Sequence, residues 1–301
     1  MTGRSSAVAT APGAPASAPA APALERIWEA EAIAGPSRGG IGERLASRYG
    51  GELQIPLRAD RPTLVANFVE TLDGVVSLDG GKAGGGEVSG HNDADRFLMG
   101  LLRALADAVV VGAGVLRNSG GPRTPGESLP AAADDYADLR NRLGLLPNPT
   151  LLVVTSSGDV DLDHPAFHDP GAPAVIAGPA AAVARLADRP LPPQVRLATM
   201  PSDDVGAELA QLIASFGGRL AVSEAGPNLT GQLVATGALD ELFLTVSPQL
   251  AGRAPGIDRL SLVEGVGFWP NLPRWLDLQS VRRSGDHLFL RYAFGANGNG
   301  R

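Results

Sequence analysis

Short apolar runs alternate with amphipathic segments along most of the chain after residue 60. Apolar runs of about four to eight residues are typical of buried strands, and apolar positions spaced three and four apart are typical of helices that cover a core. The pattern predicts strands at 64–69, 107–114, 150–157, 174–178, 195–199, 219–224 and 242–248, and helices at 93–106, 134–143, 180–187, 204–216 and 228–238.

This alternation favours an α/β fold in which helices flank a central, mostly parallel sheet. The segment 275–294, WLDLQSVRRSGDHLFLRYAF, contains two β-type patterns separated by a turn near 284–286. It predicts a C-terminal β-hairpin that adds antiparallel edge strands, so that the sheet as a whole is mixed.

The N-terminal region differs from this pattern. Residues 1–23 are rich in Ala, Pro and Ser, and prolines interrupt any apolar core that a signal peptide would need, so we expect a disordered tail. Residues 24–60 contain two short helical patterns, LERIWEAEAIA and IGERLASRY, which predict a helical extension over the core. Residues 61–295 then form the main domain, and residues 296–301 form a flexible tail.

Composition narrows the classes of function. Hydrophobic residues make up 44% of the 301 residues, and no apolar run approaches the roughly 18 residues of a membrane helix. The formal net charge of −7 argues against a nucleic-acid binder. Because cysteine is absent, disulfides and cysteine-ligated metals are excluded, and a cytoplasmic location is the default. His164 and His168 have i,i+4 spacing, but neighbouring prolines disfavour a helix, so we predict no metal site.

The stretch SEAGPN at 223–228 joins a predicted strand to a predicted helix. Glu224 lies at the carboxyl end of the strand, where open α/β sheets bind their ligands. Gly226, Pro227 and Asn228 supply flexible backbone, a fixed φ and a capping side chain at a helix start, whose free amides attract phosphate. We interpret the stretch as a binding site, with a solvated acid at a strand end as the alternative.

Other candidate positions carry weaker signals. Gly112 and Gly114 follow a buried strand and would let a ligand approach the backbone, although glycine-rich strand ends are common. Arg117 replaces the third glycine of the dinucleotide-binding pattern. Asn67 is the lone polar residue of an apolar strand, and it either points into a cleft or bonds backbone at a sheet edge. Asp73 begins an Asp-Gly pair that is a turn signal in its own right.

The predicted helix 93–106 carries two further candidates, Asp95 and Arg103. Arg103 immediately precedes a buried strand and is placed to reach a cleft. Asp95 favours the N-terminal end of a helix on electrostatic grounds. Surface ion pairing is the alternative for both residues.

Three separated blocks resemble the reductase domain of bacterial bifunctional riboflavin-biosynthesis deaminase–reductases. These blocks are NFVETLDG, LLRALADAVVVGAGVLR and SEAGPNLTGQLVATGALDELFLTVSPQLAG, and they occur in the family's order. The resemblance covers roughly residues 61–294 and implies a three-layer, dihydrofolate-reductase-like fold, an NADPH-dependent reductase and a homodimer. The family's zinc deaminase is excluded because its Pro-Cys-x-x-Cys signature needs cysteine.

The resemblance also implies roles for individual residues. Asn67, Asp95 and Glu224 become candidate catalytic residues, and Arg103, Asp73 and Glu224 become candidate substrate-binding residues. The implied cofactor-binding residues are Val69, Gly112, Gly114, Val115, Thr155, Ser156, Gly226, Pro227, Asn228 and Leu229. Within this set, the backbone of 226–232 would hold the pyrophosphate, and Thr155 to Ser157 would recognise the adenosine 2′-phosphate.

The chain departs from the family's pattern at several positions. The strand lysine of the family is Asn67 here, its serine is Thr71, and the first glycine of its Gly-Gly pair is Ala225. The family's phosphate-binding Leu-Thr-x-Arg segment has no clean counterpart, and Arg117 and Arg123 are the nearest arginines. The resemblance therefore defines the cofactor better than the substrate.

The leading hypothesis is hydride transfer from NADPH to C1′ of a ribosylamino-pyrimidine 5′-phosphate in riboflavin biosynthesis, with Asn67 replacing the lysine and water as proton donor. A dihydrofolate or dihydropterin reductase is the first alternative, because Asp95 lies roughly where dihydrofolate reductases keep a pterin-binding carboxylate. A nucleotide-binding protein without catalysis is the second. Each hypothesis implies a small-molecule ligand and neither a nucleic-acid nor a membrane partner.

Overall fold

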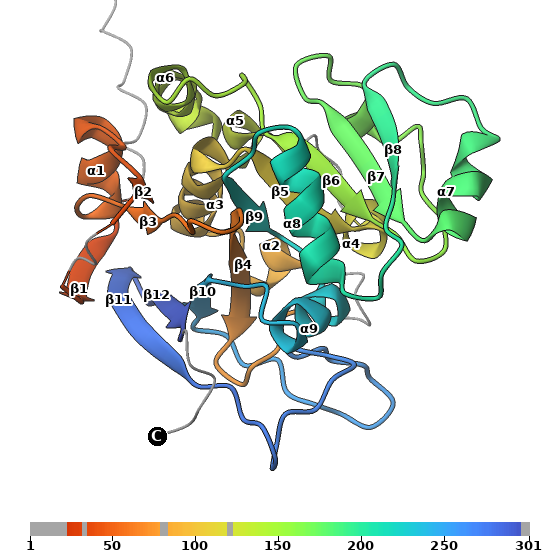
Figure 1. Cartoon of the computed structure of the whole chain (residues 1–301). Helices are drawn as coiled ribbons and strands as arrows, with labels where there is room; N and C mark the ends of the chain where they lie inside the picture. The colour runs from red at the N-terminus through yellow and green to blue at the C-terminus, as the bar shows by residue number, and fades with distance from the viewer. Residues whose placement is uncertain (1–22, 32–34, 79–83, 119–122, 296–301) are drawn as a thin grey trace, which may run out of the picture.

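The computed structural model describes residues 23–31, 35–78, 84–118 and 123–295 (Figure 1). The tails predicted at 1–23 and 296–301 lie outside these residues, apart from residue 23. Within the described residues, ten strands form one sheet in the order β1-β11-β12-β10-β4-β9-β5-β6-β7-β8. The strands are β1 (Glu25–Glu29), β4 (Thr63–Thr71), β5 (Ala108–Gly112), β6 (Thr150–Val154), β7 (Ala174–Gly178), β8 (Val195–Thr199), β9 (Leu220–Ser223), β10 (Glu241–Ser247), β11 (Leu276–Ser284) and β12 (His287–Phe294).

The sheet is mixed, as predicted. All pairs from β10 through β8 are parallel, whereas β12, β11 and β1 add on to β10 as successive antiparallel strands. Val65 at the centre of the sheet pairs with Glu241 on one side and with Val222 on the other. The central strands β4, β9 and β5 are nearly continuous apolar runs because helices cover both of their faces.

Two helical layers enclose this sheet, which confirms the three-layer prediction (Figure 1). The helices are α1 (Glu43–Tyr49), α2 (Gly85–Val88), α3 (Asp93–Leu105), α4 (Ala113–Arg117), α5 (Pro125–Ser128), α6 (Ala133–Arg142), α7 (Ala180–Ala187), α8 (Val205–Ser215) and α9 (Pro227–Ala235). Phe97 of α3 and Tyr136 of α6 share one core cluster with Val222 on one face, whereas Leu209 of α8 and Leu233 of α9 belong to the core on the other. In the part of the chain that is described, no helix is long and apolar enough to cross a bilayer.

The extension at 24–60 differs from the prediction in part. IGERLASRY forms α1 as expected, but the helical prediction for LERIWEAEAIA is wrong, because its first half is strand β1 paired with β11. The outer edge of β11 offers unpaired backbone groups, and pairing with them outweighs the weak helical tendency of so short a segment. The hairpin is therefore covered on its outer side, and β1 and β8 are the sheet edges. A small second sheet pairs β2 (Ser37–Arg38) with β3 (Ile55–Pro56).

Candidate active site

A cleft of about 1620 Å³ opens at the carboxyl ends of the parallel strands. It collects the ends of β4, β5, β6, β8 and β9, together with parts of α2, α3, α5 and the start of α9. The predicted site residues that line it are Asn67, Val69, Asp95, Arg103, Gly112, Gly114, Val115, Thr155, Ser156, Glu224, Gly226, Pro227, Asn228 and Leu229. Parallel strands bring these distant segments together because their carboxyl ends share one edge of the sheet.

Asp73 is the predicted site residue that the structure places elsewhere, outside the lining of this cleft. Its carboxylate accepts hydrogen bonds from the Thr71 hydroxyl at 2.6 Å and from the amides of Ala251 and Gly252 at 3.0 and 2.7 Å. The hydrogen bond from Thr71, followed by those from the two amides, lowers the pKa of Asp73 to about 2. These contacts correspond to the alternative interpretation of Asp73 as a turn residue.

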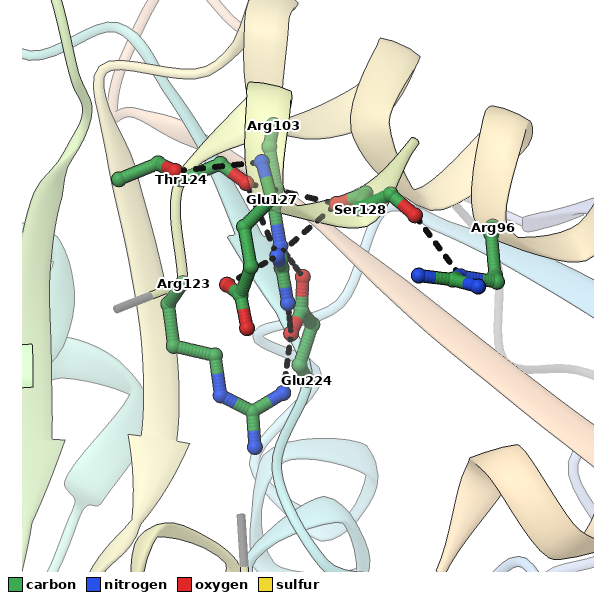
Figure 2. Close-up of polar contacts among 7 residues, drawn as sticks. All are labelled: Arg96, Arg103, Arg123, Thr124, Glu127, Ser128 and Glu224. Carbon is green, nitrogen blue, oxygen red and sulfur yellow. Dashed lines mark hydrogen bonds and ion pairs between the residues drawn. The ribbon is translucent and has the colours of Figure 1, made fainter. Parts of the chain in front are cut away.

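Arg103 and Glu224, which both line the cleft, form a buried bidentate ion pair (Figure 2). Nε of Arg103 donates to Glu224 Oε1 at 2.6 Å, and Nη2 donates to Oε2 at 2.7 Å. Nη1 donates to the Thr124 carbonyl at 3.1 Å and to the Ser128 hydroxyl at 2.9 Å. All three guanidinium nitrogens of Arg103 thus have protein acceptors, and the residue is 1% exposed. This arrangement suits a residue that orients Glu224 better than one that binds substrate directly.

Arg123 reaches the same carboxylate from the other side (Figure 2). Its Nη1 donates to Glu224 Oε2 at 3.1 Å, whereas, within the described residues, its buried Nε has no hydrogen-bond partner. The backbone of Arg123 adopts φ 53°, a left-handed conformation that is uncommon outside glycine. An unpaired buried donor and a strained backbone in a cleft are features that functional residues often share.

The cluster of Arg103, Glu224 and Arg123 carries an excess of positive charge. Burial favours the neutral form of Glu224, but Arg103 and then Arg123 outweigh it and hold the pKa of this carboxyl below its usual value. Burial lowers the pKa of Arg123, and the like charge of Arg103 acts in the same direction. One carboxylate is therefore shared by two guanidinium groups, while Glu127 contacts Arg103 at 3.5 Å from a more exposed position. An anion bound beside Arg123 would relieve this imbalance.

Asp95 lies in the first turn of α3 and is half-buried in the cleft. Desolvation raises the pKa of its carboxyl group to about 6, the negative charge of Glu224 adds to the rise, and the neighbouring hydroxyl groups of Thr245 and Ser89 act in the opposite direction. A carboxyl group with this pKa is partly protonated near neutral pH. It can therefore serve as a general acid, a role for which the sequence had suggested only water.

The turn from β9 into α9 offers a second anion-binding element. Gly226 caps α9 without a side chain, and Pro227 occupies the first helical turn. A Cβ on Gly226 would lie 3.1 Å from a methyl group of Val115, so the two glycine-rich turns approach each other closely here. Gly112 borders open space on the cleft side, where a Cβ would meet no atom within 4 Å. This narrow glycine-lined cradle at a helix N-terminus fits a pyrophosphate.

The far end of the cleft is formed by the loop after β6. Thr155 is buried and accepts a hydrogen bond from the Gly158 amide, while Ser156 and Ser157 are exposed at the rim. Arg117 of α4 lies against this loop and donates to the Asp159 carbonyl at 2.8 Å and to its carboxylate at 3.2 Å. The loop therefore brings hydroxyl groups and a cation to one rim of the cleft.

Asn67 and Val69 line the near end of the cleft from β4. Asn67 is half-buried and follows Ala66, the last β4 residue that pairs with β9, so its side chain lies where the sheet opens. This placement corresponds to the interpretation in which Asn67 points into a cleft.

Sequence reasoning missed several cleft residues, namely Ser89, His91, Arg96, Glu127, Ser128 and Asp203, and it noted Arg123 only as a nearby arginine. The segment Thr124–Glu127 did contain a usable signal. Thr124 caps α5, Pro125 occupies its first turn and Glu127 stands three residues after the cap, which is the usual pattern of a helix start.

Comparison with known proteins agrees with this geometry. The family model for the RibD C-terminal domain matches residues 62–288. The chain belongs to this family. The resemblance seen in the sequence is thereby confirmed, and the RibD family match supports the predicted reductase function. A search of curated proteins finds no significant match.

Solved structures show the same fold. RibD from Acinetobacter baumannii is 16% identical with a TM-score of 0.60, and the match covers 78% of this chain and 58% of that one. A pyrimidine reductase-like protein from Corynebacterium diphtheriae is 22% identical with a TM-score of 0.60, covering 78% and 93%. The riboflavin biosynthesis reductase Rib7 from Saccharomyces cerevisiae is 13% identical with a TM-score of 0.54, covering 79% and 92%. The chain thus spans little more than half the length of RibD.

Proposed function

We propose that the protein is an NADPH-dependent reductase that acts at C1′ of a ribosylamino-pyrimidine 5′-phosphate. The observation that carries this proposal is the presence of two anion-binding elements in one cleft. One is the glycine-bordered start of α9, and the other is Arg123, whose buried Nε has no hydrogen-bond partner among the described residues. A phosphorylated substrate and a pyrophosphate-containing cofactor need both elements at the same time.

The cofactor would occupy the part of the cleft between α4, α9 and the loop after β6. Gly112, Gly114 and Gly226 leave room for close backbone approach, and the free amides of α9 suit a pyrophosphate. Ser156 and Arg117 would face the adenosine 2′-phosphate and so favour NADPH over NADH. When bound there, NADPH supplies the hydride that forms the new C–H bond at C1′.

The substrate would occupy the part between β4, α3 and β9. Arg123 would bind its phosphate, assisted by Arg96, whose Nε donates to the Ser128 carbonyl at 2.9 Å. Glu224 orients Arg123, and Arg103 orients Glu224. The ribosylamine ring would first open to the imine, with the N–H proton passing to the ring oxygen as the C1′–O bond breaks. When C1′ is reduced, the C=N electron pair would move to nitrogen, which would take a proton from the Asp95 carboxyl.

Names of the structural neighbours support this choice of substrate. A Thermotoga maritima protein of the same fold, 16% identical, is named a diaminohydroxyphosphoribosylaminopyrimidine deaminase and 5-amino-6-(5-phosphoribosylamino)uracil reductase. The match covers 57% of that protein, and its name gives two activities. For this chain only the reductase activity is proposed. The homodimer stays a prediction of the resemblance, and the cytoplasmic location stays a prediction from the absence of cysteine.

The test compares the phosphorylated substrate with its dephosphorylated riboside. Purified protein is mixed with NADPH, and oxidation is followed through the absorbance of the reduced nicotinamide. We expect turnover of the phosphate, and we expect Arg123→Gln to raise its KM by at least about tenfold, the loss of one charge-assisted contact. The riboside should respond little to the same variant. Turnover of dihydrofolate alone, or an equal effect of Arg123→Gln on both substrates, would overturn the proposal.

A further inference from the structure

The turn between α2 and α3 has an unusual backbone. Two consecutive residues, Gly90 and His91, adopt left-handed conformations with φ 63° and 55°. His91 is not a glycine, so its conformation has an energetic cost that the surrounding structure must offset. Backbone hydrogen bonds from the His91 amide to the Gly86 carbonyl at 2.7 Å and from the Gly90 amide to the Glu87 carbonyl at 3.3 Å hold one side of this turn, and side-chain contacts to its flanks add to them.

His287 on β12 supplies contacts on both sides, although it lies far away in the sequence. Its Nε2 is 3.0 Å from the Ser89 carbonyl oxygen, before the left-handed pair. Its Nδ1 is 3.2 Å from Nδ2 of Asn92, after the pair. One imidazole ring thus bridges the two flanks of the turn.

The hydrogen bonds of Asn92 fix the protonation of this ring. Oδ1 of Asn92 caps α3 by accepting from the amides of Ala94 and Asp95 at 2.9 and 3.1 Å. The amide group of Asn92 cannot turn over without losing this cap, so its Nδ2 faces His287 as a donor. Nδ1 of His287 must then accept, and Nε2 carries the proton that is donated to Ser89. The bridge requires the neutral imidazole.

Asp95 contacts both residues that His287 bridges, Asn92 and Ser89. Its amide donates to the capping oxygen of Asn92, and the Ser89 hydroxyl lies beside its carboxyl group. We propose that His287 is a positioning residue of the site, holding the Ser89–Asn92 turn so that Asp95 projects into the cleft. Its effect on turnover rests on the proposed function, in which Asp95 donates a proton.

The position of Asp95 can be tested without substrate or cofactor. In the full-length protein labelled with ¹³C at aspartate carboxyl groups, the Asp95 signal is assigned by its loss in Asp95→Asn, and its titration is then followed by NMR. The native midpoint is expected at about 6. In His287→Ala the carboxyl group becomes more hydrated, and the midpoint should fall by on the order of one pH unit. His287→Asn restores an acceptor for Asn92 and should return the midpoint toward the native value.

A matched control is His168→Ala, since Nε2 of His168 also lies near a backbone carbonyl, that of Leu162, but this contact lies in the segment between β6 and β7 and not at the Ser89–Asn92 turn. This control should leave the midpoint unchanged. The proposal would be overturned if His287→Ala folded and its Asp95 titrated with the native midpoint. It would also be overturned if the midpoint of His287→Asn were no closer to the native value than that of His287→Ala. Should His287→Ala fail to fold, the asparagine variant is compared with His287→Gln, which mimics only Nε2. Asparagine should then lie closer to the native midpoint, and the reverse order would overturn the proposal.

These results are independent of the proposed reaction. A protein that titrates as expected but does not reduce the ribosylamino-pyrimidine phosphate would refute the proposed function and leave the role of His287 standing. An active protein whose Asp95 titration does not change in the His287 variants would refute the role of His287 and leave the proposed function standing.

Discussion

Replacing Glu224 by glutamine removes the one carboxylate that Arg103 and Arg123 share. Arg103 is 1% exposed, so its buried charge would keep only the more exposed Glu127, at 3.5 Å, as a counter-ion, and a glutamine NH₂ group would face one of its donors. Breaking a buried pair by removing one partner costs about 3–5 kcal/mol of unfolding free energy. The bonds from Arg103 to the Thr124 carbonyl and the Ser128 hydroxyl remain, which places the expected loss at the lower end of that range, about 3 kcal/mol.

The same carboxylate makes stability depend on pH. Although burial acts in the opposite direction, Arg103 and Arg123 hold the pKa of Glu224 below its usual value. Its stabilising effect is therefore complete above the pKa of the unfolded chain, about 4.3, and is lost as the pH falls through the lower pKa of the folded state. Glu224→Gln should lack this acid-side loss.

Urea unfolding of the native protein, Glu224→Gln and a surface control measures both effects. The control is Glu25→Gln, which breaks an ion pair with Arg283 whose side chains are 61% and 52% exposed. Exposed pairs contribute at most about 1 kcal/mol, so the control should change stability little. If Glu224→Gln cost no more than Glu25→Gln, the cluster would not be the electrostatic centre described here.

Three further substitutions test other parts of the site. The carboxyl of Asp95 has a raised pKa of about 6, so the native protein should lose stability as the pH rises from about 4 to about 6. In urea, Asp95→Asn should abolish that slope and gain at most about 3 kcal/mol at neutral pH, and an unchanged slope would refute the raised pKa. Gly231→Ala places a Cβ against the Glu264 carbonyl oxygen and should lower Tm by several degrees in calorimetry. Gly267→Ala, where a Cβ meets open space, should leave Tm unchanged. Equal Tm values for the two variants would show that the close approach at Gly231 is unimportant. Arg117→Gln should raise the KM for NADPH but not that for NADH, and a parallel rise in both would remove Arg117 from cofactor selection.

Most strands and the longer helices of the main domain could be predicted because each one buries a periodic or continuous apolar pattern. VRLAT, for example, forms β8 at the predicted residues. The short helices α2, α4 and α5 were not predicted, and α4 begins at residue 113, inside the strand predicted at 107–114, because four or five residues are too few to show a helical period. LERIWEAEAIA could not be predicted in the same way, because the free edge of β11 decides its conformation. The local sequence of this segment contains no information on whether a strand distant in the chain has an unpaired edge.

Some residues of the candidate site could likewise be predicted from the sequence, and others could not. Residues at the carboxyl ends of strands, such as Glu224 and Thr155, could be placed in one cleft because the parallel topology brings those ends together. Arg123 could not be assigned, since its position depends on how the segment around α5 packs against α3. Asp73 carries a carboxylate, as many binding-site residues do. That carboxylate accepts hydrogen bonds from Thr71 in its own turn and from the backbone amide of Ala251.

Isotope transfer tests the central claim most directly. The protein is incubated with the ribosylamino-pyrimidine phosphate and NADPH that carries deuterium at both C4 positions of the nicotinamide, and the product is examined by mass spectrometry and NMR. We expect a ribitylamino product that carries one deuterium at C1′. A product without deuterium, or no product while NADPH binds, would contradict the assignment of this cleft as the site of a hydride-transferring reductase.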